Sequence, residues 1–188
     1  RILYVNKPHI GTDVLAKVVQ NIRKKITACG GEVHFQTKLT AIHEKDGAVN
    51  GITVFDRAEN KSFTHACNTV CLAIGHSARD TFGMLHQKQE LVMEAKAFAV
   101  GFRVEHPQEM MNLQQYGALH AHELPAAPYK VTATIATGRG VYSFCMCPGG
   151  YVVNASSEKN RLAVNGMSYH DRAGENANSA LIVTVNPE

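Results

Sequence analysis

The chain has 188 residues, of which 45% are hydrophobic and 19% are charged, the composition of a globular protein. No run approaches the roughly 20 apolar residues of a membrane-spanning helix, and the formal charge of +3 is spread out rather than gathered into a nucleic-acid-binding stripe. The cysteine count is odd and the spacing irregular, which argues against a secreted disulfide framework and favours a protein with reduced thiols in the cytoplasm.

The first predicted element is a long helix. Apolar residues recur at three- and four-residue steps from Val14 to Ile26. Thr12 or Asp13 is the expected N-cap, and Gly30-Gly31 provides the left-handed residue that ends a helix.

Strands follow this helix. We expect a strand over 32–36 and one strand on each side of the turn Lys45-Asp46-Gly47. A further strand is expected to end near Ala66, and another to cover the apolar run 69–74. A second helix is expected over 77–88, with Ser77 as its N-cap.

The second half of the chain is richer in strands. A strand is expected over 97–107, weakened by Gly101, then a short helix ending at Gly117. Three strands joined by Gly-Arg-Gly and Pro-Gly-Gly turns follow, and two more strands close the sequence. The pattern predicts a mixed α/β (α+β) protein with domains at 1–95 and 96–188.

The pair Cys145-Met146-Cys147 is too tight for a zinc knuckle, and no second pair lies near it, so no metal site is expected. In a regular strand the two cysteines share a face, with Cα atoms roughly 6.5–7 Å apart. A disulfide between them would therefore require a bend in the strand. Packing, a redox site and a nucleophile all remain open as roles.

Two strand-or-loop-to-helix junctions are candidate ligand sites. Gly75 and His76 follow an apolar run, where a glycine lets a ligand approach the backbone near a helix N-terminus. His9 and Thr12 lie at the start of the long helix, and Arg172, like Arg139, lies in a glycine-rich turn that could grip an anion. Ordinary connectors are the more common explanation of the Gly75 and His9 segments, and surface charges explain the two arginines equally well.

Several stretches resemble one bacterial family. They include "PHIGTDVLAKVVQNIRKKI", "LAIGHSARDTF", "AFAVGFRVEHPQEMMN", "GRGVYSFCMCPGGYVVNASSE" and "LAVNGMSYHDRAGENANSALIVTV". These are similar to the uncharacterised FAD-dependent dehydrogenases, also called NAD(FAD)-utilising dehydrogenases. The resemblance implies a partial FAD-binding domain of the glutathione-reductase type and an inserted β-rich lid domain, that is, an internal fragment of an FAD-dependent oxidoreductase.

The resemblance also implies residue roles. It points to Lys38, Leu39, Gly75, His76 and Thr12 as cofactor-binding residues. Cys145, Cys147 and His9 become catalytic candidates, and Arg139, Ser143, Asn165 and Arg172 become substrate candidates.

The implied cofactor is FAD, with NAD(P)H as a reductant and a small molecule as substrate. The sequence contains no Gly-x-Gly-x-x-Gly fingerprint, so we expect residues 1–188 alone to be inactive and not to hold FAD tightly. Strand edges left open would favour homo-oligomers. The alternative function is a non-catalytic ligand-binding or interaction module derived from the inserted domain.

Overall fold

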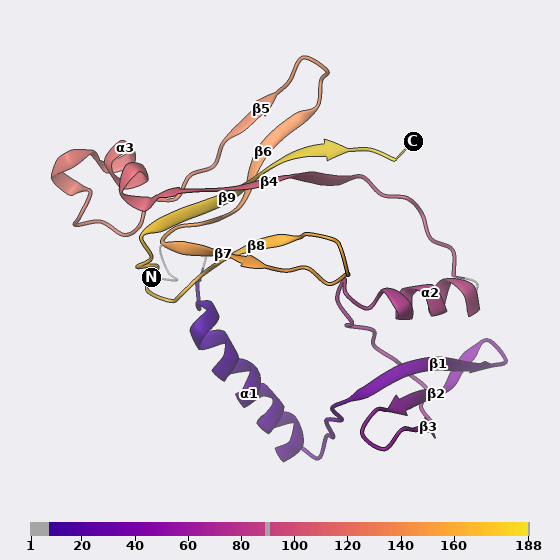
Figure 1. Ribbon diagram of the computed structural model, residues 1–188. Helices are drawn as coiled ribbons and strands as arrows, with labels where there is room; N and C mark the ends of the chain where they lie inside the picture. Colours follow the sequence, from indigo (N-terminus) through magenta and orange to yellow (C-terminus); the bar gives the residue numbers. More distant parts are fainter. Residues whose placement is uncertain (1–7, 89–90, 188) are drawn as a thin grey trace. The chain divides into compact units, whose positions relative to one another are not determined.

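The computed structural model describes residues 8–88 and 91–187 and shows three helices and three antiparallel sheets in that part of the chain (Figure 1). The helices are α1 (Thr12–Ala28), α2 (Arg79–Lys88) and α3 (Gln108–His120). The strands are β1 (Thr37–Lys45), β2 (Ala48–Asp56), β3 (Lys61–His65), β4 (Phe98–Pro107), β5 (Thr132–Thr134), β6 (Gly140–Cys147), β7 (Gly150–Asn154), β8 (Val164–Ser168) and β9 (Asn176–Val185). The prediction of a mixed α+β fold is confirmed.

The chain forms two compact units. One contains the residues up to Lys24 together with those from Ala95 onward, and the other runs from Lys25 to Glu94. The first unit holds the four-stranded sheet β4-β9-β6-β5 and the hairpin β7-β8, while the second holds the sheet β1-β2-β3 and α2.

Helix α1 has the predicted length, but its start differs from the prediction. The Leu15 N–H donates to the Gly11 carbonyl at 3.0 Å, so Gly11 occupies the capping position. Thr12 and Asp13 are not caps because their side chains bond instead to the Ser168 carbonyl and the His170 N–H. The Gly30-Gly31 ending is confirmed: the Gly31 N–H donates to the Ile26 carbonyl at 3.0 Å and Gly30 has φ +85°.

The three-stranded meander follows from local turn chemistry. Asp46 and Gly47 have φ angles of +54° and +76°, the positive pair of a two-residue hairpin turn, and Lys45 pairs with Ala48. Helix α2 begins two residues later than predicted. The Ala78 carbonyl accepts its first bond, from the Phe82 N–H at 3.1 Å, so Ser77 is not the N-cap.

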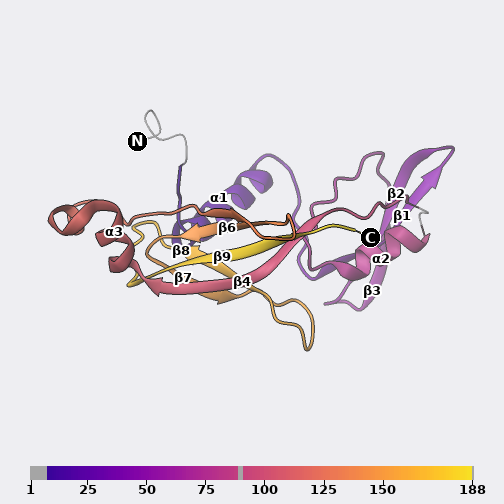
Figure 2. The same ribbon diagram turned by 90° about the horizontal axis from the view of Figure 1, so that it is seen from above.

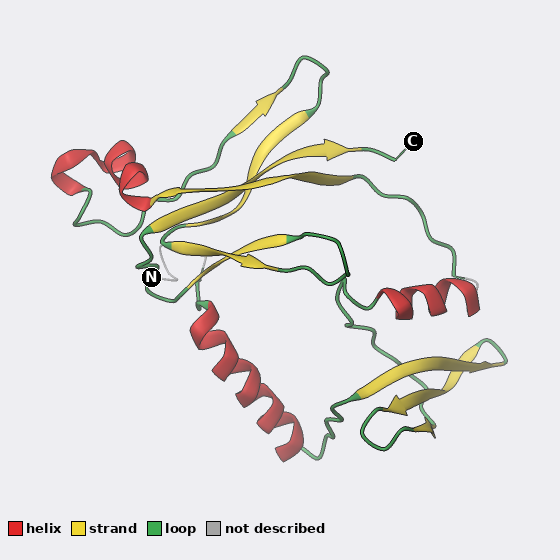
Figure 3. Cartoon of the chain, viewed as in Figure 1, coloured by secondary structure: helices red, strands yellow, loops and turns green. Residues whose placement is uncertain are grey.

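Two predicted strands, 32–36 and 69–74, are wrong. Both segments are irregular in the structure and are drawn as loop on either side of the β1-β2-β3 sheet along the chain (Figure 3). A strand needs a neighbour to bond its backbone N–H and C=O groups, and the described residues offer these segments none. Their apolar side chains stay open: Phe35 is 65% exposed and Leu72 is 41% exposed.

In the four-stranded sheet, β9 is central and pairs with β4 over ten residues. Gly101 does not weaken this ladder. A Cβ at Gly101 would overlap the Leu181 carbonyl oxygen, so glycine is what lets the two strands approach. Phe98, Val100, Phe102 and Val104 alternate onto one face of β4, where Phe102 is 83% exposed.

Helix α3 follows β4 directly and lies at the Pro107 end of the β4–β9 pair (Figure 2). It does not end at Gly117 as predicted. The chain kinks there, with φ +72° and ψ +169°, and a further helical turn runs to His120. The most buried part of this unit lies at the start of β9, where Ala177, Asn178 and Ser179 are fully buried.

Candidate functional site

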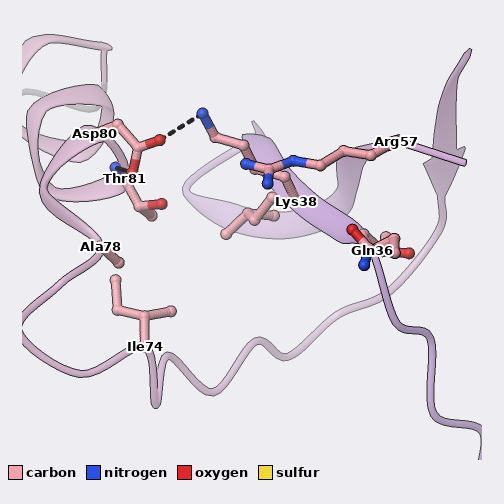
Figure 4. A pocket seen from close by; sticks show the side chains of 9 residues that line it. Gln36, Lys38, Arg57, Ile74, Ala78, Asp80 and Thr81 are labelled. Carbon is pink, nitrogen blue, oxygen red and sulfur yellow. Dashed lines mark hydrogen bonds and ion pairs between the residues drawn. The ribbon is translucent and has the colours of Figure 1, made fainter. Parts of the chain in front are cut away.

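In the unit of residues 25–94, a cavity of about 380 Å³ lies at the start of β1 and the start of α2 (Figure 4). We call it the Lys38 pocket. Its lining residues are Gln36, Thr37, Lys38, Leu39, Arg57, Ile74, Ala78, Asp80 and Thr81. The structure therefore brings two predicted cofactor residues, Lys38 and Leu39, against the segment 74–78, which contains Gly75 and His76.

An ion pair closes one side of the Lys38 pocket. Lys38 Nζ lies 2.5 Å from Asp80 Oδ2, which joins β1 to α2. The hydrogen bond from Lys38 and then the Thr81 N–H hold the pKa of the Asp80 carboxyl below its ordinary value of 3.8. Arg57 also lines the pocket and is its second positively charged side chain. β1 is an edge strand, so every second residue turns its N–H and C=O away from β2.

We expect Lys38→Met to raise the pKa of the Asp80 carboxyl towards 3.8, because the largest cause of its depression is lost. A carbon-detected NMR titration of the carboxyl resonance measures this pKa. The folded pKa is depressed, so the stabilisation from Asp80 is present above the unfolded pKa and is lost as pH falls through the folded pKa. Lys45→Met, at the other end of β1, is the control and should leave the Asp80 titration unchanged. An equal shift in both variants would contradict the assignment.

A second cavity, of about 300 Å³, lies in the other unit, and we call it the Cys147 pocket. Predicted residues from three distant parts of the sequence line it: His9 with Thr12, Cys147, and Arg172. The Arg172 Nε atom is buried and has no hydrogen-bond partner.

The start of α1 is tied to this pocket by polar contacts with the chain beyond β8. His9 Nε2 lies 3.0 Å from the Tyr169 carbonyl oxygen, and His170 Nδ1 lies 2.8 Å from the Ile10 carbonyl oxygen. The His170 N–H donates to Asp13 Oδ1 at 3.0 Å. Because Asp13 already faces the helix start with a negative charge, the site does not favour an added anion there.

The two cysteines of β6 occupy different surroundings. Cys147 is 8% exposed, whereas Cys145 is exposed and borders a third cavity, of about 480 Å³, together with Ser143. Burial raises the pKa of the Cys147 thiol, and the neighbouring Cys145 adds to that rise. The expectation that both thiols share one face of a regular strand is wrong, because β6 carries a bulge between Phe144 and Cys147.

The strands around these cysteines fall in a region with known relatives. Residues 97–188 match the family model described as FAD-dependent protein, C-terminal domain-like. This region is similar to the C-terminal domain of FAD-dependent proteins. An uncharacterized protein of Clostridium beijerinckii is 54% identical over 189 residues, which cover all of this chain and 34% of that protein. The chain thus spans about a third of the length of the curated relative it matches.

The FAD-dependent-protein-like region, residues 97–188, contains both thiols and all four predicted substrate residues. Asn165 lies near Cys145, with 3.9 Å between its Oδ1 and the Cys145 Sγ. Arg139 lines none of the three cavities, and its carbonyl closes the β5–β6 turn by accepting from the Ile135 N–H. Gly75 and His76 do not line the Lys38 pocket, although Ile74 and Ala78 on either side of them do.

Sequence reasoning missed Arg57, Asp80, Arg103 and Asn178. Arg103 Nη1 donates to Asn178 Oδ1 at 2.7 Å and to the Cys145 carbonyl at 3.0 Å. The arginine in the mostly apolar strand 97–107 could have been noticed in the sequence. Its partners could not be predicted, because they depend on which strands lie side by side in the sheet. Asp80 is a similar case, since only the packing of α2 on β1 brings it to Lys38.

Within the described ranges, no three His, Cys, Asp or Glu side chains gather closely enough to hold a metal ion. In the same ranges, none of the helices combines the length and the apolar character needed to cross a bilayer.

Proposed function

We propose that this chain is part of an FAD-dependent oxidoreductase of the glutathione-reductase type, and that the Lys38 pocket receives the adenosine half of FAD in the intact protein. The observation that carries the proposal is the pocket itself: an edge strand, two cations and an apolar wall meet at the residues expected to hold this cofactor. The similarity of residues 97–188 to a domain of FAD-dependent proteins supports it.

The residues present fit an adenosine group. Leu39, Ile74 and Ala78 offer apolar surface for the flat faces of an adenine ring. The free edge of β1 offers backbone N–H and C=O groups to its polar edge. Arg57 suits the negative charge of a neighbouring phosphate, while Lys38 offsets the charge of Asp80, with which it is paired. The volume of about 380 Å³ lies within the range of about 300–1,000 Å³ typical of small-molecule sites.

Flavin, when bound, supplies the electron and hydride chemistry, and the protein supplies binding and orientation. In this proposal NAD(P)H reduces the flavin. Gly75 and His76 hold the cofactor from the loop between Ile74 and Ala78, and Thr12 is a further cofactor contact. The small-molecule substrate binds residues of the FAD-dependent-protein-like region, with Arg139, Ser143, Asn165 and Arg172 as its contacts, and the exposed apolar face of β4 favours self-association.

The intact protein should therefore purify with FAD, visible as flavin absorbance. Lys38→Glu places a negative charge at the pocket and should weaken FAD binding at least tenfold, whereas binding of FMN, which lacks the adenosine half, should change little. The ratio of FAD to FMN affinity, measured by fluorescence quenching of the stripped protein, is the readout.

Lys45→Glu makes the same charge reversal at the other end of β1 and is the matched control. Equal loss of FAD and FMN binding in Lys38→Glu would indicate a folding defect rather than a lost adenosine contact. An intact protein that neither carries nor binds FAD would contradict the proposal and would favour the non-catalytic binding module.

A further inference from the structure

The bulge in β6 gives the two cysteines an arrangement that a regular strand cannot provide. Phe144 pairs with Ala180 and Cys147 pairs with Asn178, so β6 uses one residue more than β9 over this stretch. Cys145 takes the extra position with φ +49°, the left-handed region that a non-glycine residue seldom adopts. The strand bends at this point, which is the change that a disulfide between these cysteines requires.

The bent segment brings the Cys147 thiol against the backbone of Cys145. The Cys147 Sγ lies 3.4 Å from the Cys145 carbonyl oxygen. Arg103 holds the bend by donating to the same Cys145 carbonyl at 3.0 Å. Opposite them, a Cβ at Gly166 would come within 2.7 Å of the Cys147 Sγ, so only glycine leaves this sulfur its space.

Two buried donors beside the thiols have no partner. Arg103 Nε and Asn178 Nδ2 lack hydrogen bonds, and Asn178 is fully buried directly opposite Cys147 in the β6–β9 ladder. Buried polar groups without partners are rare and require an explanation. The charge of Arg103 acts to lower the pKa of the Cys147 thiol, but burial raises that pKa by more, so the thiol stays protonated until it reacts.

The two thiols also differ in access. Cys145 is exposed at the rim of the cavity of about 480 Å³, so a molecule from solvent can reach it. Cys147 is 8% exposed and lines the Cys147 pocket instead. This is the arrangement of an attacking thiol and a resolving thiol.

We propose that Cys145 and Cys147 form a reversible disulfide by exchange with a low-molecular-weight disulfide such as glutathione disulfide. The Cys145 thiolate attacks one sulfur of glutathione disulfide, so that a mixed disulfide forms and one glutathione thiolate leaves. Cys147 then loses its proton and attacks the Cys145 sulfur, and the second glutathione thiolate leaves. Two protein thiols thus give two electrons and two protons to glutathione disulfide, which becomes two glutathione molecules. The proposal does not depend on FAD binding.

The test uses the intact protein. The protein is first reduced and then incubated with glutathione disulfide. Remaining free thiols are alkylated, and the protein is digested with trypsin. Cleavage after Arg139 and Lys159 releases a peptide whose only cysteines are Cys145 and Cys147. Mass spectrometry should show this peptide lighter by two hydrogen atoms and resistant to alkylation. Added dithiothreitol should restore both thiols.

Variants separate the two roles. Cys147→Ser should stop at the mixed disulfide, with one glutathione retained on Cys145, and Cys145→Ser should react at least tenfold more slowly because Cys147 is buried. Cys71→Ser, at an exposed cysteine of the other unit, is the control and should form the Cys145–Cys147 disulfide like the original protein. A peptide with both thiols still free, or a stable glutathione adduct in the unsubstituted protein, would overturn the proposal. The measurement on the unsubstituted protein decides the matter even if a variant fails to fold.

Discussion

Gly149→Ala is expected to lower the free energy of unfolding of the unit that contains the thiols by about 3 kcal/mol. Gly149 has φ +49°, where a Cβ is strained, and the added Cβ would overlap the Arg172 carbonyl oxygen. That oxygen belongs to the backbone and cannot rotate away. The turn also uses the Gly149 N–H and carbonyl, which bond to Gln108 and to the Gly174 N–H.

Urea unfolding followed by circular dichroism measures this loss. Gly138→Ala is the matched control: Gly138 has φ +81°, but nothing lies within 4 Å of its added Cβ. It should therefore show only the backbone strain, about 1 kcal/mol. If the two variants lose the same stability, the overlap with Arg172 is not what constrains the turn.

Gln108→Ala is expected to cost about 3 kcal/mol as well, for a different reason. The Gln108 side chain is 6% exposed and forms hydrogen bonds with two buried backbone groups. Its Oε1 accepts from the Gly149 N–H at 2.8 Å, and its Nε2 donates to the Ala127 carbonyl at 3.0 Å. Truncation leaves both groups buried without partners, and each such group costs about 1–3 kcal/mol.

The same urea experiment tests this prediction, with Gln114→Ala as its control. Gln114 is exposed on the same helix, so its truncation should change the free energy of unfolding by less than about 0.5 kcal/mol. A similarly small effect for Gln108→Ala would mean that water replaces the lost bonds. Gln108 and Gly149 together hold the turn that follows Cys147. Gln108→Ala and Gly149→Ala should therefore also slow formation of the disulfide between Cys145 and Cys147.

Features written into a few adjacent residues could be predicted from the sequence. The Asp46-Gly47 turn and the Gly30-Gly31 helix ending follow from backbone preferences of those residues alone. The strands at 32–36 and 69–74 could not be placed, because a strand exists only where another strand accepts its hydrogen bonds. The predicted N-caps were wrong for a related reason. Thr12 and Asp13 are residue types that cap helices, but their side chains form hydrogen bonds with partners more than 150 residues away in the sequence.

The candidate sites show the same division. Resemblance alone suggested Lys38 and Leu39, and the structure adds Asp80, whose contact with Lys38 depends on how α2 packs on β1. The cysteine pair was visible in the sequence, but its geometry was not. A period of two residues places both thiols on one face of a strand, and only the register against β9 shows the bulge that bends the chain between them.

The contact between His9 and Tyr169 closes a span of 160 residues. A ribosome adding about 5–20 residues per second therefore needs roughly ten to thirty seconds between making the two partners. Residues 25–94, in contrast, complete their own unit within one uninterrupted stretch. During synthesis the meander can form early, while the beginning of α1 must wait for the chain beyond β8 to emerge. Chaperone dependence should accordingly concentrate on residues 8–24, whose unit is completed only by strands made later.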